Sequence, residues 1–199
     1  MFSRGVMVVA VAALAAGGAS AAELVGVHGT STRFTSTMEA TVGDKPVRLL
    51  LTGAAVRQKV FVNVYAVGSY LQEGVTVRSA EALAEADCVK RLHLVMERDV
   101  DGKDMAAAFQ SAVRANHPEP AFAAEVEQLT RLLQGESARK GEHIFLTHLP
   151  GVGLHIARPG KADFTIRNPA FSRAVWDIYL GKNNLGEGIK KGLVSRVAQ

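Results

Sequence analysis

Apolar and polar residues alternate along the first half of the chain in the manner of β-strands. Within residues 35–42 the alternation is regular, which predicts a strand with one buried face. Three further runs, at 47–55, 60–71 and 89–96, are apolar and include many β-branched and aromatic residues, as is typical of strands. The cluster at 43–46, with the sequence GDKP, predicts a turn between the first two strands.

The spacing of apolar residues becomes helical after residue 100. Asp101 can cap a helix that runs to about Asn116, and Pro118 and Pro120 stop it. Apolar residues at helical spacing then continue over 122–135, which predicts a second helix.

The last third of the chain predicts a hairpin and further short elements. Apolar stretches at 143–149 and 154–157 flank the turn sequence PGVG at 150–153. The elements expected after it are a short strand at 164–166, a helix at 171–180 ended by Gly181, and a partly basic helix at 185–197. Strands first, then helices, then a hairpin and helices indicate an α+β fold with an antiparallel sheet backed by helices.

The N-terminus has the three-part pattern of a secretory leader. Arg4 supplies a positive charge, residues 6–16 are apolar throughout, and small residues follow at 19–21. The apolar run is shorter than the roughly 20 residues that span a bilayer. We therefore expect residues 1–21 to be removed as a signal peptide. The remaining residues, 22–199, have the length of one domain, which we expect to work in the periplasm without stable membrane insertion.

Charge and cysteine content narrow the possible functions. The net charge of +4 is spread along the chain without a basic arm, so nucleic-acid binding is not indicated. The single cysteine, Cys88, cannot form an internal disulfide, and we expect a buried, inert thiol. No phosphate-binding loop or Gly-x-Ser-x-Gly motif occurs, and no cofactor is expected.

Several short motifs are more specific together than any one is alone. They are TGAAVRQK at 52–59, VYAVGSYL at 64–71, KGEHI at 140–144, PGVG at 150–153 and WDIYLG at 176–181. In this order and spacing the chain resembles the bacterial chalcone-isomerase-like family. More distantly, it resembles plant chalcone isomerases and the fatty-acid-binding proteins of the same fold. The resemblance extends over nearly all of the expected mature chain and implies an open-faced β-sandwich, in which a layer of helices covers a large antiparallel sheet.

The resemblance also implies a ligand site. In the enzymes, an arginine that ends a Gly-x-Gly-x-Arg segment binds the anionic substrate, and Arg57 matches it here, with Ala55 in place of the second glycine. Tyr65 stands where the enzymes carry a threonine, and Met105 and Ala112 align with a catalytic tyrosine and asparagine. The fatty-acid-binding relatives instead pair an arginine with a tyrosine, which matches Arg57 and Tyr65.

These matches favour a non-catalytic binder of a small apolar acid, such as a fatty acid. Arg57 would hold the carboxylate and Tyr65 would donate a hydrogen bond to it, while Phe61, Met105 and Phe109 would line the acyl chain. Two alternatives remain open. One is an isomerase of the chalcone isomerase type that uses Arg57 as its anchor, and the other is an envelope scaffolding protein whose cleft is closed by side chains.

The spacing of Arg57 and Tyr65 limits how they can act together. The two residues share one parity, but eight residues of a single strand span about 26 Å. A hairpin turn near Gln58 would shorten this distance. In the alternative interpretation, Arg57 is an exposed turn residue and Tyr65 belongs to the core.

Two histidines in the predicted hairpin raise the question of a metal site. If Gly151 and Val152 form a two-residue turn, His148 and His155 lie directly opposite each other. A metal site needs a third ligand, and the sequence marks none. We therefore expect a solvated or hydrogen-bonded pair and no metal.

Overall fold

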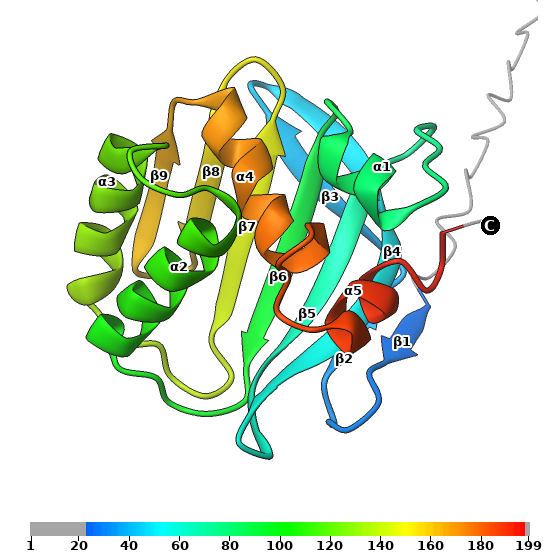
Figure 1. Ribbon diagram of the computed structural model, residues 1–199. Helices are drawn as coiled ribbons and strands as arrows, with labels where there is room; N and C mark the ends of the chain where they lie inside the picture. The colour runs from blue at the N-terminus through cyan, green and yellow to red at the C-terminus, as the bar shows by residue number, and fades with distance from the viewer. Residues whose placement is uncertain (1–22, 198–199) are drawn as a thin grey trace, which may run out of the picture.

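The computed structural model describes residues 23–197 and contains a seven-stranded antiparallel sheet with helices on one face (Figure 1). The order of strands in the sheet follows their order in the sequence. The strands are β3 (Thr37–Val42), β4 (Lys45–Lys59), β5 (Val62–Gln72), β6 (Lys90–Met96), β7 (His143–Leu149), β8 (Gly153–Arg158) and β9 (Ala162–Ile166).

Five helices cover one face of this sheet. They are α1 (Ala80–Glu85), α2 (Gly102–Asn116), α3 (Ala123–Gln134), α4 (Pro169–Leu180) and α5 (Glu187–Leu193). Helix α4 is the most apolar and lies centrally in the helical layer (Figure 1), with Phe171, Trp176 and Leu180 fully buried. Apolar side chains of all five helices join those of the sheet in one continuous core, so the helical layer and the sheet form a unit.

A second, smaller core lies on the opposite face of the sheet. There a two-stranded sheet of β1 (Leu24–Gly26) and β2 (Arg33–Thr35) packs through Phe34 against Leu49, Leu51 and Tyr70. The large sheet also curls over this face. The Arg91 guanidinium on β6 donates to the Glu39 carbonyl oxygen on β3 at 3.1 Å, although β4 and β5 separate the two strands in the sheet.

The structure confirms the α+β class and the expected order of elements. Asp101 caps α2 as predicted, with its carboxylate accepting from the Lys103 amide at 2.9 Å, and Gly181 ends α4. Three details differ. The expected turn at 43–46 is shorter, because β4 already begins at Lys45. Helix α5 covers only the middle of the segment 185–197, and the sequence did not indicate α1 or β1.

The hairpin of β7 and β8 contradicts the expected pairing of His148 with His155. Its turn has three residues instead of two, because Leu149 pairs with Gly153. His148 therefore lies opposite Leu154, and His155 lies opposite Thr147. A shift of one residue moves a side chain to the other face of a sheet, so the two histidines point to opposite sides.

No helix within residues 23–197 is both long and apolar enough to cross a bilayer. The expected signal peptide falls outside the described residues.

Candidate functional site

The hairpin of β4 and β5 brings Arg57 and Tyr65 together. The chain turns at Val60 and Phe61, and Arg57 then lies directly opposite Tyr65 in the ladder. The estimate of about 26 Å applies only to one unbroken strand, whereas opposite residues of paired strands have Cβ atoms about 5 Å apart. The turn lies a few residues beyond the position near Gln58 that the sequence suggested.

A β-bulge adjoins this pair. The register shifts between Arg57 and Gln58, because Gln58 pairs with Asn63 and leaves Val64 as an extra residue on β5. Bulges bend a strand locally and redirect its side chains. Arg57 and Tyr65 both lie on the helical side of the sheet, since neighbouring Ala55 and Val67 of the same parity belong to the large core.

The Arg57 guanidinium reaches from the sheet to the helical layer. Its Nη1 donates to the carbonyl oxygen of Leu185 at 3.1 Å, in the segment between α4 and α5. Within residues 23–197, no carboxylate lies within 4.0 Å of this guanidinium, in contrast to residues such as Arg158, which pairs with Glu142. Among the described residues, the half-buried positive charge of Arg57 is therefore balanced by a peptide dipole alone.

A second tyrosine completes the site. Tyr179 on α4 is buried, and its hydroxyl lies 3.3 Å from the hydroxyl of Tyr65. The sequence placed Tyr179 among the inward residues of its helix but did not connect it with Arg57. The motif WDIYLG contains Tyr179, yet a contact across 114 residues leaves no local signal.

Burial keeps both phenols protonated. Desolvation raises the pKa of Tyr65 and raises the pKa of Tyr179 well above its usual value. The positive charge of Arg57 opposes this effect at both groups but does not outweigh it. At neutral pH the site therefore offers one guanidinium and two hydroxyl donors.

Helix α2 supplies apolar residues to the same core. Met105, Phe109 and Ala112 are partly buried and pack against the large cluster, and Phe109 meets Phe171 edge to face at 6.5 Å. Phe61 does not join them. It lies at the tip of the β4–β5 hairpin with 97% of its surface exposed, so the structure does not place it where an acyl chain would lie near α2.

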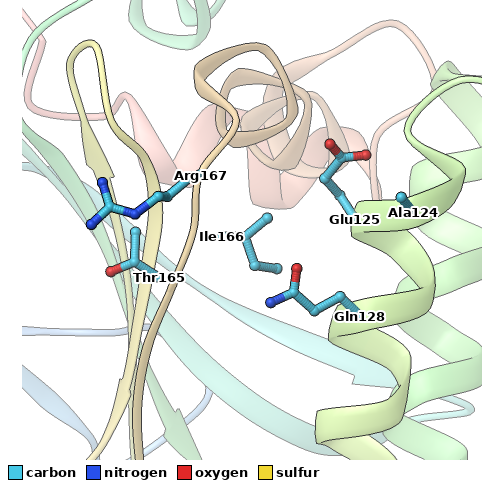
Figure 2. A pocket seen from close by; sticks show the side chains of 6 residues that line it. All are labelled: Ala124, Glu125, Gln128, Thr165, Ile166 and Arg167. Atoms are coloured by element: carbon cyan, nitrogen blue, oxygen red, sulfur yellow. The ribbon is translucent and has the colours of Figure 1, made fainter.

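The hollows of the described surface include two open ones of about 330 Å³ each, and neither of these two is lined by Arg57 or Tyr65. One lies between α3 and the end of β9, lined by Glu125, Gln128 and Arg167 among others (Figure 2). The other lies on the opposite face of the sheet, beside Arg91.

The histidines serve structural contacts. His148 is fully buried and bonds to Ser172 at 2.9 Å and to Asp87 at 3.1 Å, whereas His155 pairs with Asp163 on the outer face. Within the described residues, no group of three or more His, Cys, Asp or Glu side chains is placed to hold a metal. Cys88 is only half-buried, and burial raises the pKa of its thiol, which disfavours the reactive thiolate.

Comparison with known proteins supports the resemblance seen in the sequence. The family model described as chalcone isomerase-like matches residues 31–195. A crystal structure of a fatty-acid binding protein from Arabidopsis thaliana has the same fold, with a TM-score of 0.69 and 19% identity, covering 88% of this chain and 97% of that one. No match was found among curated protein sequences. Because the family model spans most of the chain and the fold agrees, the protein belongs to the chalcone isomerase-like family.

Proposed function

We propose that the protein is a non-catalytic binder of a small apolar acid, such as a fatty acid, and that it works in the periplasm. The observation that carries this proposal is the Arg57 guanidinium, which has no carboxylate partner within residues 23–197 and lies beside the buried Tyr179 and the partly buried Tyr65. A ligand carboxylate would supply the missing negative charge.

The donors of the site suit a carboxylate. Transfer of an anion from water into an apolar interior costs free energy, which charge-assisted bonds to a guanidinium offset. Tyr65 and Tyr179 carry two hydroxyl protons, and their mutual bond uses only one of them. The second proton remains for a ligand oxygen. In the bound state the carboxylate would replace the Leu185 carbonyl at Arg57.

The apolar part of the ligand would lie toward α2. Met105 and Phe109 are partly buried and border the filled core there. Methionine has a flexible, unbranched side chain that adapts to a ligand. Because Met105 and Phe109 already pack against the large core, an acyl chain that enters beside α2 would require both side chains to change rotamers.

The catalytic alternative has less support. The positions that we align with the catalytic tyrosine and asparagine of the enzymes hold Met105 and Ala112, whose side chains donate no hydrogen bond. If purified protein accelerates the loss of chalcone absorbance above the spontaneous rate, this alternative replaces the binder.

A relative of the same fold is consistent with the proposal. The Arabidopsis thaliana protein is described as a fatty-acid binding protein, and at 19% identity the likeness shows the fold alone. The ligand class is therefore inferred from the donors at Arg57.

A titration with medium- and long-chain fatty acids tests the proposal. We expect Arg57→Ala to weaken binding by roughly tenfold to a hundredfold, the loss typical of a hydrogen bond to a charged group. Tyr65→Phe should weaken it less, because a neutral donor is lost. Arg167→Ala, which removes an exposed guanidinium from the hollow in Figure 2, is the matched control and should bind as the wild type does.

Failure of the wild-type protein to take up fatty acids would exclude the binder. Empty protein that co-purifies with an envelope partner would favour the scaffolding alternative instead. The proposed location has its own test, because an exported protein should begin near Ala21 or Ala22 when its N-terminus is measured by mass spectrometry.

A further inference from the structure

The tip of the β4–β5 hairpin exposes three consecutive apolar residues. Val60, Phe61 and Val62 are 81%, 97% and 53% exposed. The hairpin extends beyond the helical layer at the lower end of the molecule, as Figure 1 shows. A single exposed apolar residue needs no explanation, but an apolar cluster at the tip of a hairpin does.

The conformation of the turn makes this sequence more unusual. Val60 and Phe61 have φ angles of +50° and +64°, in the left-handed region. Tight hairpin turns of this kind favour Asn-Gly or Asp-Gly, and a β-branched residue is rarely found there. Neither packing nor turn chemistry therefore accounts for the two apolar side chains. Strained residues of this kind are concentrated at functional sites.

Positive charges without acidic partners flank the tip. Lys59 is exposed in the strand immediately before it. Arg98 is exposed at the same end of the sheet, because the amide of the preceding Glu97 donates to the Val64 carbonyl at 2.9 Å. Within the described part of the chain, neither cation has a carboxylate within 4.0 Å, although Glu81, Glu127 and other exposed acids are paired elsewhere.

The shape of the tip favours a lipid surface over a protein. A stable protein interface buries about 800 Å² on each partner. Three residues at the tip of a hairpin are too few to bury that area. A bilayer surface accepts apolar side chains without a complementary shape, while neighbouring lysines and arginines remain at the level of the headgroups.

We propose that Val60, Phe61 and Val62 insert into the surface of a bilayer that contains anionic phospholipid, with Lys59 and Arg98 at the headgroups. Arg57 and Tyr65 form the third residue pair behind the turn, about 10 Å from it along the strands. An apolar acid that leaves the bilayer would meet these donors just behind the exposed Gln58–Asn63 pair. The choice of a lipid surface rests on the proposed function, because such acids reside in membranes.

Vesicle co-sedimentation tests this docking directly. The sample is exported protein whose N-terminal mass shows that the leader has been removed, mixed with vesicles of phosphatidylethanolamine and phosphatidylglycerol. The double variant Val60→Asn/Phe61→Gly should bind at least tenfold more weakly than the wild type. Its melting temperature should rise, because the new residues suit the turn. Reduced binding therefore cannot be attributed to unfolding.

Two further variants control the comparison. Val75→Asn removes an exposed apolar side chain beyond the opposite end of β5 and should leave vesicle binding unchanged. With Phe61→Trp, brominated phospholipids should quench the new indole, whereas the buried Trp176 gives a constant background. A double variant that binds as the wild type does, or a Phe61→Trp indole that is not quenched, would overturn the proposal.

The two proposals fail in different ways. Arg57→Ala should bind vesicles normally but lose the fatty acid. If the wild type takes up fatty acids in solution but does not bind vesicles, docking is excluded and the binder stands. If it binds vesicles through the tip but never takes up fatty acids, the binder is excluded and membrane docking stands.

Discussion

At the scale of single residues, the Arg57 site depends on groups that lie far apart in the sequence. Arg57 and Tyr65 could be selected from the sequence because both fall in motifs shared with relatives. Their contact follows from the hairpin turn, which the sequence indicated only approximately. Tyr179 could not be selected, because its bond to Tyr65 joins positions 114 residues apart. The sequence predicts that Phe61 lines the acyl chain, but the turn directs this side chain to solvent.

Buried histidines should make the stability of the fold depend on pH, and His93 should contribute most clearly. His93 lies on the outer face of the sheet between the rings of Phe34 and Phe145, and its Nε2 is 2.8 Å from Nδ1 of His143. Burial, together with the positive charge of His143 and Arg91, lowers the pKa of His93 to about 3.

The direction of this pH dependence follows from the pH at which His93 binds its proton in the unfolded and in the folded protein. In the unfolded chain His93 takes up a proton near its usual pKa of about 6.5, whereas in the folded protein it remains neutral to about pH 3. We therefore expect the free energy of unfolding to fall as the pH decreases from about 6.5 toward 3, by on the order of a few kcal/mol.

Urea unfolding at several pH values measures this dependence. His93→Phe keeps the aromatic packing and should make the profile less steep between pH 6.5 and 4, while the buried His148, whose pKa burial also lowers, retains part of the dependence. His155→Gln, which alters a partly exposed histidine of the same sheet face, is the control and should leave the profile unchanged. An equal loss of stability in His93→Phe and wild type would show that other groups cause the acid dependence.

At the scale of elements, close backbone contact fixes α5 against β4. A second bulge, between Leu51 and Gly53, lets the Thr52 hydroxyl donate to the Leu193 carbonyl at 2.9 Å. A Cβ atom on Gly53 would lie 2.1 Å from the Gly192 carbonyl oxygen, so glycine is required there. A Cβ atom on Gly192 would lie 2.8 Å from the Ala54 carbonyl oxygen. The first glycine of the family motif therefore serves helix packing.

Replacement of two glycines of α5 by alanine should change the stability of the protein in opposite directions. Gly192→Ala should destabilise the protein by about 1–3 kcal/mol, because the methyl group meets the backbone of β4. Gly188→Ala has open space around it and should stabilise the helix by about 0.5–1 kcal/mol. The midpoints of urea unfolding give both values. If Gly192→Ala were neutral, α5 would not be held as closely as the structure indicates.

The elements that the sequence missed are held by tertiary contacts. Helix α1 has six residues, too few for a periodic signal, and depends on groups at its ends. Ser79 caps its start, and the buried ammonium of Lys90 donates to the Leu83 and Ala84 carbonyls at its end. The sequence predicts a two-residue turn between β7 and β8, whereas the turn has three residues. Because of this one extra residue, His148 and His155 lie on opposite faces of the sheet instead of the same face.

At the scale of the whole molecule, the two faces of the sheet differ in the elements that cover them. The helical face contains the large core and the Arg57 site, and the outer face is partly covered by β1 and β2. The period of the apolar residues and the order of the elements were sufficient to predict an antiparallel sheet backed by helices, but not the cover that β1 and β2 form on its outer face. They could not predict that Tyr179 meets Tyr65, because such a contact depends on which residues of separate elements come together.

The most direct test of the binding proposal is native mass spectrometry of the exported protein as purified, followed by denaturing extraction, alongside Arg57→Ala. The proposal predicts one fatty acid for each wild-type chain and empty protein for the variant. Wild-type protein that is empty and remains empty after incubation with fatty acids would contradict it.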